Sequence, residues 1–299
     1  MKRIRKWLLL VGLALLPTGC ARAQTGAAGQ ARVGAATGRA QVYTVATTAV
    51  DARFQVPQVR LPDAAVARRI NRVLLRDVTG YFETVDSAAS PVRQLRQAAR
   101  ECCYNEATKS WQEFGNGGRT ATAYTVLLNQ DFLLSLAISH DNADRTELGG
   151  SYFTFDLRTG RLLTLGDLLA DPPAQLNQRF GAAINRRLRD DLAEVTAIYG
   201  DSAVIDDVSR LYGFHGVDEW NTAPRHQAAA DTVVDYQYPG EFALRPKALL
   251  LFHSVGMMPA QYEFLPNDTY IFPYERLHPR GLLVVVAKKA KQARLAKKR

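Results

Sequence analysis

The stretch Gly149–Leu169, GGSYFTFDLRTGRLLTLGDLL, is the most regular part of the sequence and decides its fold class. Phe153, Phe155 and Leu157 alternate with polar residues, which is typical of a strand with one buried face. The segment RTGR follows, and its Gly160 can adopt the positive φ that a tight hairpin turn requires. We therefore expect an antiparallel hairpin here, with the return strand directly after the turn.

The end of the same stretch predicts a helix start. Thr164 and Asp167 in TLGD match a capping box, in which both side chains satisfy backbone groups of a first helical turn. The TFD sequence that ends at Asp156 also occurs where some metal-dependent hydrolases hold their metal. Deacetylases of that class use two consecutive aspartates and a nearby pair of histidines. Here Leu157 follows Asp156, and no two of the five histidines lie within ten residues of each other. We interpret the stretch as scaffold.

Short strands and a few helices make up the rest of the predicted fold. Strands are expected at 41–49, 120–128, 132–139, 242–244, 248–252 and 269–277, the last running into a helical turn. Helices are expected from Asp63, from Ser90-Pro91, and from Asp171-Pro172 to Gly200, where caps or prolines favour helix ends. Residues 201–240 are less regular. Consecutive hairpins favour an α+β fold, with two or three helices covering an antiparallel sheet of hairpins.

The first 23 residues have the features of an export signal. A basic start is followed by an apolar run, Trp7–Leu16, that is too short to span a bilayer. Two cleavage sites fit: one after Ala23 in ARA, and one at Cys20 in the lipobox-like PTGC, which would make Cys20 a lipidated N-terminus. No other segment reaches the roughly 18 apolar residues that a membrane helix needs. We expect an exported protein, either periplasmic or anchored as a lipoprotein facing the periplasm.

Positive charge is concentrated at the two ends of the chain. The net charge is +9, but residues 1–23 carry five basic groups and residues 288–299 carry seven, with no acid in either, so residues 24–287 have a net charge of −3. This mildly acidic part has no nucleic-acid footprint. We expect residues 288–299 to be a solvated basic tail, whose contact with a membrane or wall polymer would be weak charge attraction.

Composition divides the chain into four parts. These are the export signal 1–23, a flexible linker 24–40 rich in small residues, a domain 41–287 and the basic tail 288–299. The domain is long enough to bury one large core. It could also consist of two halves, 41–145 and 146–287, that share a core.

Cys102 and Cys103 are adjacent, and two readings of them stay open. Val92 and Leu95 lie at helical spacing from Cys102, which places Cys102 on a buried helix face. The pair then consists of packed thiols, or it forms a strained vicinal disulfide that acts as a redox switch. A bridge between neighbours does not fit inside a helix, so the sequence favours packed thiols.

Four segments together resemble a known extracytoplasmic domain. They are VPQVRLPDAAVARRINRVL, YTVLLNQDFLLSLAIS, the opening stretch, and YEFLPNDTYIFPYERL. In this order they resemble the domain of unknown function of the RsiV anti-sigma factor, which also precedes the catalytic domain of the wall deacetylase PdaC. The likeness covers residues 41–277. Its most specific element is GG-x-Y-x-x-FDL-x-TG-x-x-LTL-x-DLL.

The resemblance implies an α+β domain in the cell envelope, and in the anti-sigma factor this domain recognises a lysozyme protein. The family's Gly-Gly is usually followed by Ala-His, whereas Ser151 and Tyr152 follow here, so no role of that histidine is carried over. No contact residue of the family can be placed on this chain. We expect no anti-sigma activity, because the sequence shows neither a sigma-binding part nor the membrane helix that follows it.

No catalytic residue, metal ligand or cofactor is assigned from the sequence, which has no HExxH, GxSxG or glycine-rich phosphate loop. His140 has the parity of the apolar residues in its strand, which favours a structural histidine over a base or ligand. Asp141, Asn142, Asp144 and Glu147 miss the spacing of an EF-hand. We interpret them as a solvated acidic loop.

The segment YGFHGVDEW supplies the candidate binding residues, which are Tyr212, Phe214, His215 and Trp220. Aromatic residues mixed with charge can stack on sugar rings or anchor a protein partner, and they also form satellite apolar clusters under long loops. The sequence predicts an exported, non-catalytic binding module of the cell envelope. Its partner would be a peptidoglycan-type glycan or an envelope protein such as a lysozyme-like protein. The alternatives are an envelope hydrolase with a dispersed site and a purely structural envelope protein.

Overall fold

The hairpin predicted from the patterned stretch is present in the computed structural model of the chain. Strand β7 (Gly149–Asp156) pairs antiparallel with β8 (Arg161–Leu162). Gly160 lies in the turn with φ +70°, and its N–H donates to Asp156 O at 2.7 Å. The expected positive φ is therefore confirmed, and glycine is the residue that adopts it without strain.

The predicted helix start is also confirmed. Helix α3 (Leu165–Leu168) begins directly after Thr164, whose N–H donates to Asp167 Oδ2 at 2.8 Å. The same carboxylate accepts two hydrogen bonds from Arg161, at 2.9 and 3.0 Å. Asp167 thus accepts a hydrogen bond from a backbone N–H at the start of α3 and, through Arg161, connects α3 to β8.

The structure describes residues 38–45, 50, 52–112, 119–142, 149–200, 202–214, 241–255 and 264–297, all of them within one compact unit, Ala35–Arg299. Helices and antiparallel sheets of two to four strands make this part of the chain an α+β fold, as the sequence predicts. Within the same ranges, no helix combines the length and apolar character needed to cross a membrane.

A four-stranded antiparallel sheet of order β5-β6-β7-β8 lies at the centre. Strands β5 (Arg119–Gln130) and β6 (Leu133–Asn142) meet at a two-residue turn, where Asp131 and Phe132 have φ values of +52° and +63°. Two positive φ values are typical of a type I′ turn. The sequence predicts strands at 120–128 and 132–139, whereas β5 continues to Gln130 and β6 begins at Leu133.

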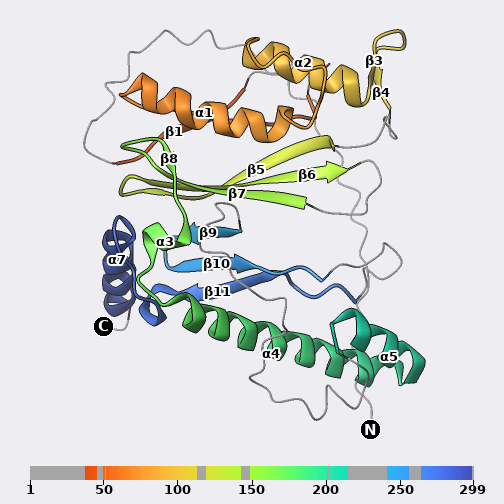
Figure 1. The fold of residues 1–299 in the computed structure, drawn as a ribbon, viewed down its shortest axis with the longest axis vertical. Coiled ribbons are helices and arrows are strands. Elements are labelled where there is room, and N and C mark those ends of the chain that lie inside the picture. The colour runs from red at the N-terminus through yellow and green to blue at the C-terminus, as the bar shows by residue number, and fades with distance from the viewer. Residues whose placement is uncertain are drawn as a thin grey trace, which may run out of the picture. The chain divides into compact units, whose positions relative to one another are not determined.

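Two helices cover one face of this sheet (Figure 1). They are α1 (Ala64–Thr79) and α2 (Pro91–Cys102). Asp63 caps α1 as predicted, accepting from the backbone N–H groups of Ala65 and Val66 at 2.8 and 3.1 Å. Ser90 occupies the N-cap position of α2, but its side chain makes no cap bond. The buried residues of this layer include Ile70, Leu74, Leu95, Leu134, Leu136, Ile138, Phe153 and Phe155.

A second sheet lies against the other face. Its order is β11-β10-β9, built from β9 (Phe242–Arg245), β10 (Ala248–Phe252) and β11 (Thr269–Pro273). The N–H of Leu244 donates to Ser135 Oγ at 2.9 Å, which joins the two sheets through a buried polar contact. The rings of Tyr152 and Phe252 stack between them, with centroids 3.6 Å apart.

Helices α4 (Pro173–Tyr199) and α5 (Ser202–Leu211) pack on the outer face of the second sheet, so helices flank the two sheets on both sides (Figure 1). Phe180 of α4 meets Tyr270 edge to face, with centroids 5.4 Å apart. Gly200 ends α4 in the left-handed conformation, as predicted. The sequence analysis did not predict α5.

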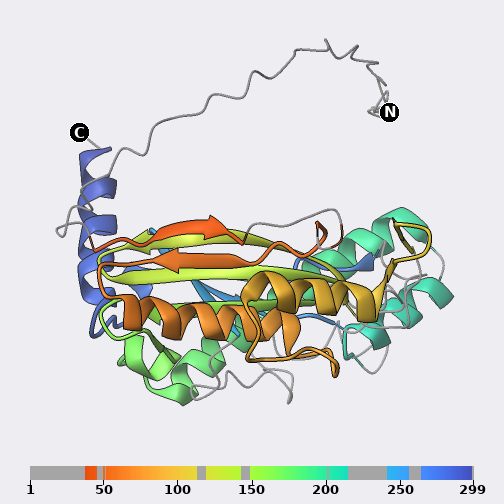
Figure 2. The ribbon, with the colours of Figure 1, turned by 90° about the horizontal axis from the view of Figure 1, so that it is seen from above.

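Four short strands lie beside α1 and α2. They are β1 (Gln41–Thr44), β2 (Pro57–Arg60), β3 (Tyr104–Asn105) and β4 (Ser110–Trp111), paired as two antiparallel ribbons. Seen from above, β1 and β2 run beside the main sheet (Figure 2). Asn129 holds the start of this region through two hydrogen bonds with the backbone of Ala40, at 2.9 and 2.8 Å.

Most of the predicted basic tail is helical. Helix α7 (Leu283–Ala296) begins inside the predicted domain and continues through the basic residues, following the short helical turn η2 (Tyr274–Arg276). Leu283 and Val286 are fully buried in the core shared with α4. This apolar first turn anchors the helix, while most of the basic residues after it stay exposed to solvent.

The buried carboxylate of Asp171 connects the C-terminal segment to α4, and we call this set of contacts the Asp171 clasp. It accepts from the backbone N–H of His278 at 2.6 Å and from His278 Nδ1 at 3.1 Å, and it also pairs with Arg179. Burial raises the pKa of Asp171, but the hydrogen bonds from His278 and Arg179 outweigh it and hold the pKa below its ordinary value. The helix itself begins at Pro173, with Pro172 at the N-cap, so Asp171 acts as a clasp rather than as a helix cap.

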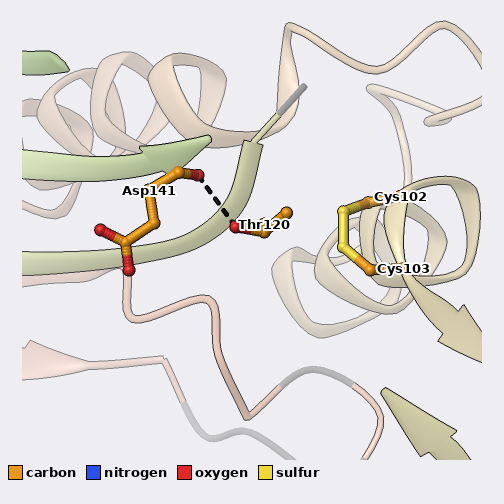
Figure 3. Close-up of a disulfide and its surroundings, with 4 residues drawn as sticks. All are labelled: Cys102, Cys103, Thr120 and Asp141. Atoms are coloured by element: carbon orange, nitrogen blue, oxygen red, sulfur yellow. Dashed lines mark hydrogen bonds between the residues drawn. A yellow bond between two sulfur atoms is a disulfide. The ribbon is translucent and has the colours of Figure 1, made fainter. Parts of the chain in front are cut away.

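Cys102 and Cys103 form a vicinal disulfide, shown at the end of α2 in Figure 3. The favoured reading of two packed thiols is therefore corrected. Cys102 is the last helical residue, and Cys103 follows with φ −150° and ψ −5°, outside the helical region. The bridge thus lies at the helix end, where the objection to a bridge inside a helix does not apply. Both side chains are buried.

The two halves considered in the sequence analysis would meet between β6 and β7. These strands pair along their length, from Leu133 with Asp156 to His140 with Gly149. The sheet that they form contributes buried residues to both apolar clusters, Leu134 to one and Leu133 to the other. A boundary at residue 145 would therefore divide the central sheet.

Candidate functional site

Two of the four predicted binding residues are described, and both belong to the core. Tyr212 is 4% exposed and Phe214 is 8% exposed. The hydroxyl of Tyr212 donates to Phe264 O at 2.6 Å, and burial, with a smaller effect of the Asp191 charge, raises the pKa of Tyr212 to about 12. His215 and Trp220 lie outside the described residues. A binding role of this segment therefore stays a prediction.

Tyr212 nevertheless lies at the bottom of a surface groove of about 260 Å³, which we call the Tyr212 groove. The last turns of α4, the end of α5 and the segment before β11 form its walls. It is lined by Asp191, Glu194, Val195, Ile198, Tyr199, Tyr212, Phe264, Leu265, Pro266 and Asn267.

The groove presents aromatic and apolar side chains to solvent. Tyr199 is 43% exposed, and its ring meets that of Phe264 with centroids 5.4 Å apart. Ile198 and Leu265 beside them are also exposed. Solvent-exposed apolar side chains that cluster around a concavity are a common mark of a binding site.

The charged groups of the groove are carboxylates. Burial raises the pKa of Asp191, Arg187 lowers it, and the neighbouring carboxylates of Glu194 and Asp190 raise it further, so the net direction is upward. Asn267 adds an amide side chain, whose oxygen accepts from the N–H of Thr269 at 2.8 Å. Acceptors beside an aromatic ring suit a neutral ligand rich in hydroxyl groups, and they disfavour an anion.

Sequence reasoning missed Tyr199 and Phe264, although one signal was available for the first. The apolar stripe of α4 runs from Leu176 to Val195, and Ile198 and Tyr199 extend it by one more turn at the same spacing. Two large apolar residues at the end of a helix, directly before Gly200, indicate a face that continues beyond the core. No local pattern marks Phe264, because its role depends on the position of α4.

A polar cluster of His140, Ser151 and Asp77 bears on the hydrolase alternative. Ser151 Oγ donates to Asp77 Oδ1 at 2.8 Å, and it lies 3.1 Å from His140 Nε2. His140 Nε2 is also 3.2 Å from Asp77 Oδ2. His140 is 4% exposed. The cluster therefore links α1 to the adjacent strands β6 and β7 within the fold.

The order of these contacts differs from that of a nucleophilic triad. In a triad, one histidine nitrogen accepts the serine proton while the other donates to the carboxylate. Here the serine proton points to Asp77, and a single nitrogen, Nε2, faces both partners. Nδ1 of His140 is buried and has no hydrogen-bond partner in the described part of the chain. We interpret the cluster as structural, in agreement with the buried histidine that strand parity predicts.

The other described histidines lie elsewhere. His278 belongs to the Asp171 clasp, and burial lowers the pKa of His253, which follows β10. Within the described ranges, no three His, Cys, Asp or Glu side chains are placed to share a metal ion. Of the acidic loop, Asp144 and Glu147 lie outside the described residues.

Comparisons with known proteins reveal distant structural likeness only. No protein-family model matches the chain, and no curated protein matches it. A solved structure of a DUF3298 family member from Bacteroides fragilis is 13% identical, with a TM-score of 0.45, and the match covers 84% of this chain and 98% of that one. A DUF3298 family protein from Pseudomonas aeruginosa is also 13% identical, with a TM-score of 0.39 and coverages of 82% and 93%.

Both structures are similar to this chain and belong to a family whose name denotes a domain of unknown function. Neither is described as RsiV-type, so that finer assignment stays an expectation from the sequence motifs. Likeness at this level carries no argument about a ligand or a reaction.

Proposed function

We propose that the chain is an exported, non-catalytic binding domain of the bacterial cell envelope, and that it holds a sugar unit of a wall glycan in the Tyr212 groove. The observation that carries this proposal is the exposed ring of Tyr199 beside carboxylate and amide groups in one concavity. The face of a sugar ring can pack on the tyrosine, while its hydroxyls donate to the acceptors.

The charge of the groove supports a neutral glycan over an anionic wall polymer. Asp191 and Glu194 line it, and no cation is found among its lining residues in the part of the chain that the structure describes. A volume of about 260 Å³ is below the range usual for drug-sized ligands, which fits recognition of one ring at a time along a longer chain. A wall polymer repeats the same sugar units and would therefore offer many equivalent sites to this groove.

Export is supported by the sequence alone, through the basic and apolar segments of residues 1–23. Non-catalytic binding is supported by the arrangement of titratable groups. Among the described residues that line the groove there is no histidine, and the cluster of His140, Ser151 and Asp77 lines none of the described grooves.

The test compares two exposed tyrosines in a pull-down of the mature chain on purified peptidoglycan sacculi. Tyr199→Ala removes the ring of the groove, whereas Tyr43→Ala removes a ring of similar exposure, 40%, on β1. We expect Tyr199→Ala to weaken binding about tenfold, the loss of roughly one stacked ring, and Tyr43→Ala to change it less than twofold. Binding should persist in high salt, because no ion pair between groove and glycan is involved.

Equal retention of the two variants would contradict the proposal. So would the release of soluble wall fragments by the wild-type chain, which would favour the hydrolase alternative. Retention by an immobilised lysozyme-type protein, without retention by sacculi, would favour the envelope protein as partner instead.

A further inference from the structure

A second and larger groove, of about 530 Å³, lies between α7 and the edge strand β11. We call it the α7 groove. Its lining residues are Lys247, Ala248, Ile271, Pro273, Tyr274, Glu275, Pro279, Val284, Ala287, Lys288, Ala290, Lys291, Arg294 and Lys297. Figure 1 shows α7 standing at one end of the second sheet. The groove shares no lining residue with the Tyr212 groove.

The position of α7 is fixed, so the groove is part of the folded domain. Leu283 and Val286 are buried at the start of the helix. Further along, Lys289 pairs with Asp131 of the β5–β6 turn, and Arg294 pairs with Glu275 of η2. These contacts hold α7 on two sides and leave its groove-facing stripe beside β11.

The interior of the groove is largely apolar. Val284, Ala287 and Ala290 of α7 lie at helical spacing on one face, opposite Ile271 and Pro273 of β11. The side chain of Ile271 is 58% exposed, which is unusual for a large apolar residue in a strand. Its exposure leaves an apolar surface that a ligand can cover.

Cations surround this apolar interior. Lys288, Lys291 and Arg294 repeat every three residues along α7, Lys297 follows directly after its end, and Lys247 lies in the β9–β10 turn. Arg294 is paired, but no carboxylate lies within ion-pair distance of the four lysines in the part of the chain that the structure describes. One end of a bound molecule would therefore meet uncompensated positive charge.

We propose that the α7 groove binds a single-chain anionic amphiphile, that is, one alkyl chain carrying a phosphate or carboxylate headgroup. The alkyl chain would cover Ile271 and the small residues of α7. The headgroup would lie among Lys288, Lys291 and Lys247. A hydrophilic polyanion would leave the apolar interior unused, and a neutral lipid would leave the lysines without partners. The combination of both surfaces in one groove points to an amphiphile.

The first experiment measures binding of dodecyl phosphate to the mature chain by calorimetry, below the concentration at which the probe forms micelles. Decyl phosphate, dodecyl maltoside and inorganic phosphate serve as comparison probes. Each buried methylene contributes about 0.8 kcal/mol, or roughly fourfold in affinity. Dodecyl phosphate should therefore bind about fifteenfold more tightly than decyl phosphate. Inorganic phosphate should not compete at tenfold excess.

Variants separate the two halves of the groove. Ala290→Phe fills the interior, and Ile271→Ser removes an apolar contact at a position that is 58% exposed, so the fold should tolerate it. Both should weaken dodecyl phosphate at least fivefold. Lys291→Gln should weaken dodecyl phosphate about fivefold and leave dodecyl maltoside unchanged. Lys289→Gln is the matched control, because it removes the same charge from the same helix but lies outside the groove, and the buried Leu283 and Val286 keep α7 in place without the pair to Asp131. It should change affinity less than twofold.

Several outcomes would overturn the proposal. Equal binding of decyl and dodecyl phosphate would show that the alkyl chain is not held. Equal effects of Lys289→Gln and Lys291→Gln would indicate attraction to the helix as a whole. Binding to vesicles of anionic phospholipid, without binding of the monomeric probe, would identify a membrane-surface contact instead. Loss of sacculus binding in Tyr199→Ala would leave these results unchanged, since the two grooves are separate.

Discussion

At the scale of single residues, Gly160 shows how closely a turn is fitted to the helix behind it. Its φ of +70° already favours glycine. A Cβ at this position would also lie 3.0 Å from Val66 O and 3.3 Å from Arg69 Cβ, both on α1. A side chain at this turn is therefore disfavoured for two reasons: the backbone has a positive φ, and α1 packs closely against it.

Gly160→Val should destabilise the domain by about 2–3 kcal/mol, because a β-branched residue is strained at positive φ and meets α1. Asp156→Asn should cost about 1 kcal/mol or less. Its carboxylate accepts from the N–H of Arg158 at 2.9 Å and from the guanidinium at 3.0 Å, but Arg158 is half exposed and the pair is screened. Urea unfolding of the two variants checks the order. A larger loss for Asp156→Asn would contradict the tight fit of Gly160 against α1.

Asp171 gives a prediction that depends on pH. Its pKa is held below the ordinary value of 3.8, against the effect of burial, by hydrogen bonds from His278 and Arg179. Stability from a carboxylate with a lowered folded pKa is present above the unfolded pKa and is lost as pH falls through the folded value. Asp171→Asn should therefore cost about 2–3 kcal/mol at pH 7 and clearly less at pH 3. Urea unfolding at both values measures the difference, and an equal cost at both would contradict the clasp.

The residues differ in how far the sequence could predict them. Gly160, Asp63 and Gly200 were predictable because a turn, a cap and a helix end are local features. The sequence predicts a helix start at Asp171, because its partner His278 is 107 positions away and no local pattern connects them. Tyr212 was selected for its neighbours in sequence, but the fold buries it and exposes Tyr199 beside it.

At the scale of elements, the sequence predicted most helices and strands but not where α2 ends. The helical spacing of Val92, Leu95 and Cys102 is confirmed, and the helix stops at Cys102. Cys103 leaves the helical region, which brings two adjacent cysteines into a bridge instead of onto two faces of a helix. The extent of α7 was also missed, because a run of basic residues resembles a solvated end until its apolar first turn is seen to be buried.

The vicinal disulfide should contribute little to stability. A bridge between neighbours closes a very short loop, so the entropy that it removes from the unfolded chain is worth only about 1 kcal/mol. We expect the protein purified without reductant to show no reactive thiol at Cys102 or Cys103 after unfolding, and two after reduction. Maleimide labelling followed by mass spectrometry counts them. Two thiols without reductant would restore the packed-thiol reading.

At the scale of the whole molecule, α7 is part of the core and not an appendage. A chain that ends at Leu282 loses Leu283 and Val286, two buried side chains worth about 1.5–3 kcal/mol each. For a domain of this size the loss should lower Tm by roughly 10 °C. A chain that ends at Lys297 is the control and should melt like the full protein. Thermal melts followed by circular dichroism compare them, and an unchanged Tm for the shorter chain would contradict the role of α7.

The two apolar clusters on opposite faces of the central sheet are also completed at different times during synthesis of the chain. The cluster under α1 and α2 draws all its buried residues from Ala40 to Leu157, whereas the other needs side chains as far along the chain as Val286. Synthesis proceeds from the N-terminus at about 5–20 residues per second, so the second cluster is completed on the order of ten seconds after the first. During that interval Leu128 and Leu133 lie on an uncovered sheet face, and a chaperone that shields this face would act in that interval.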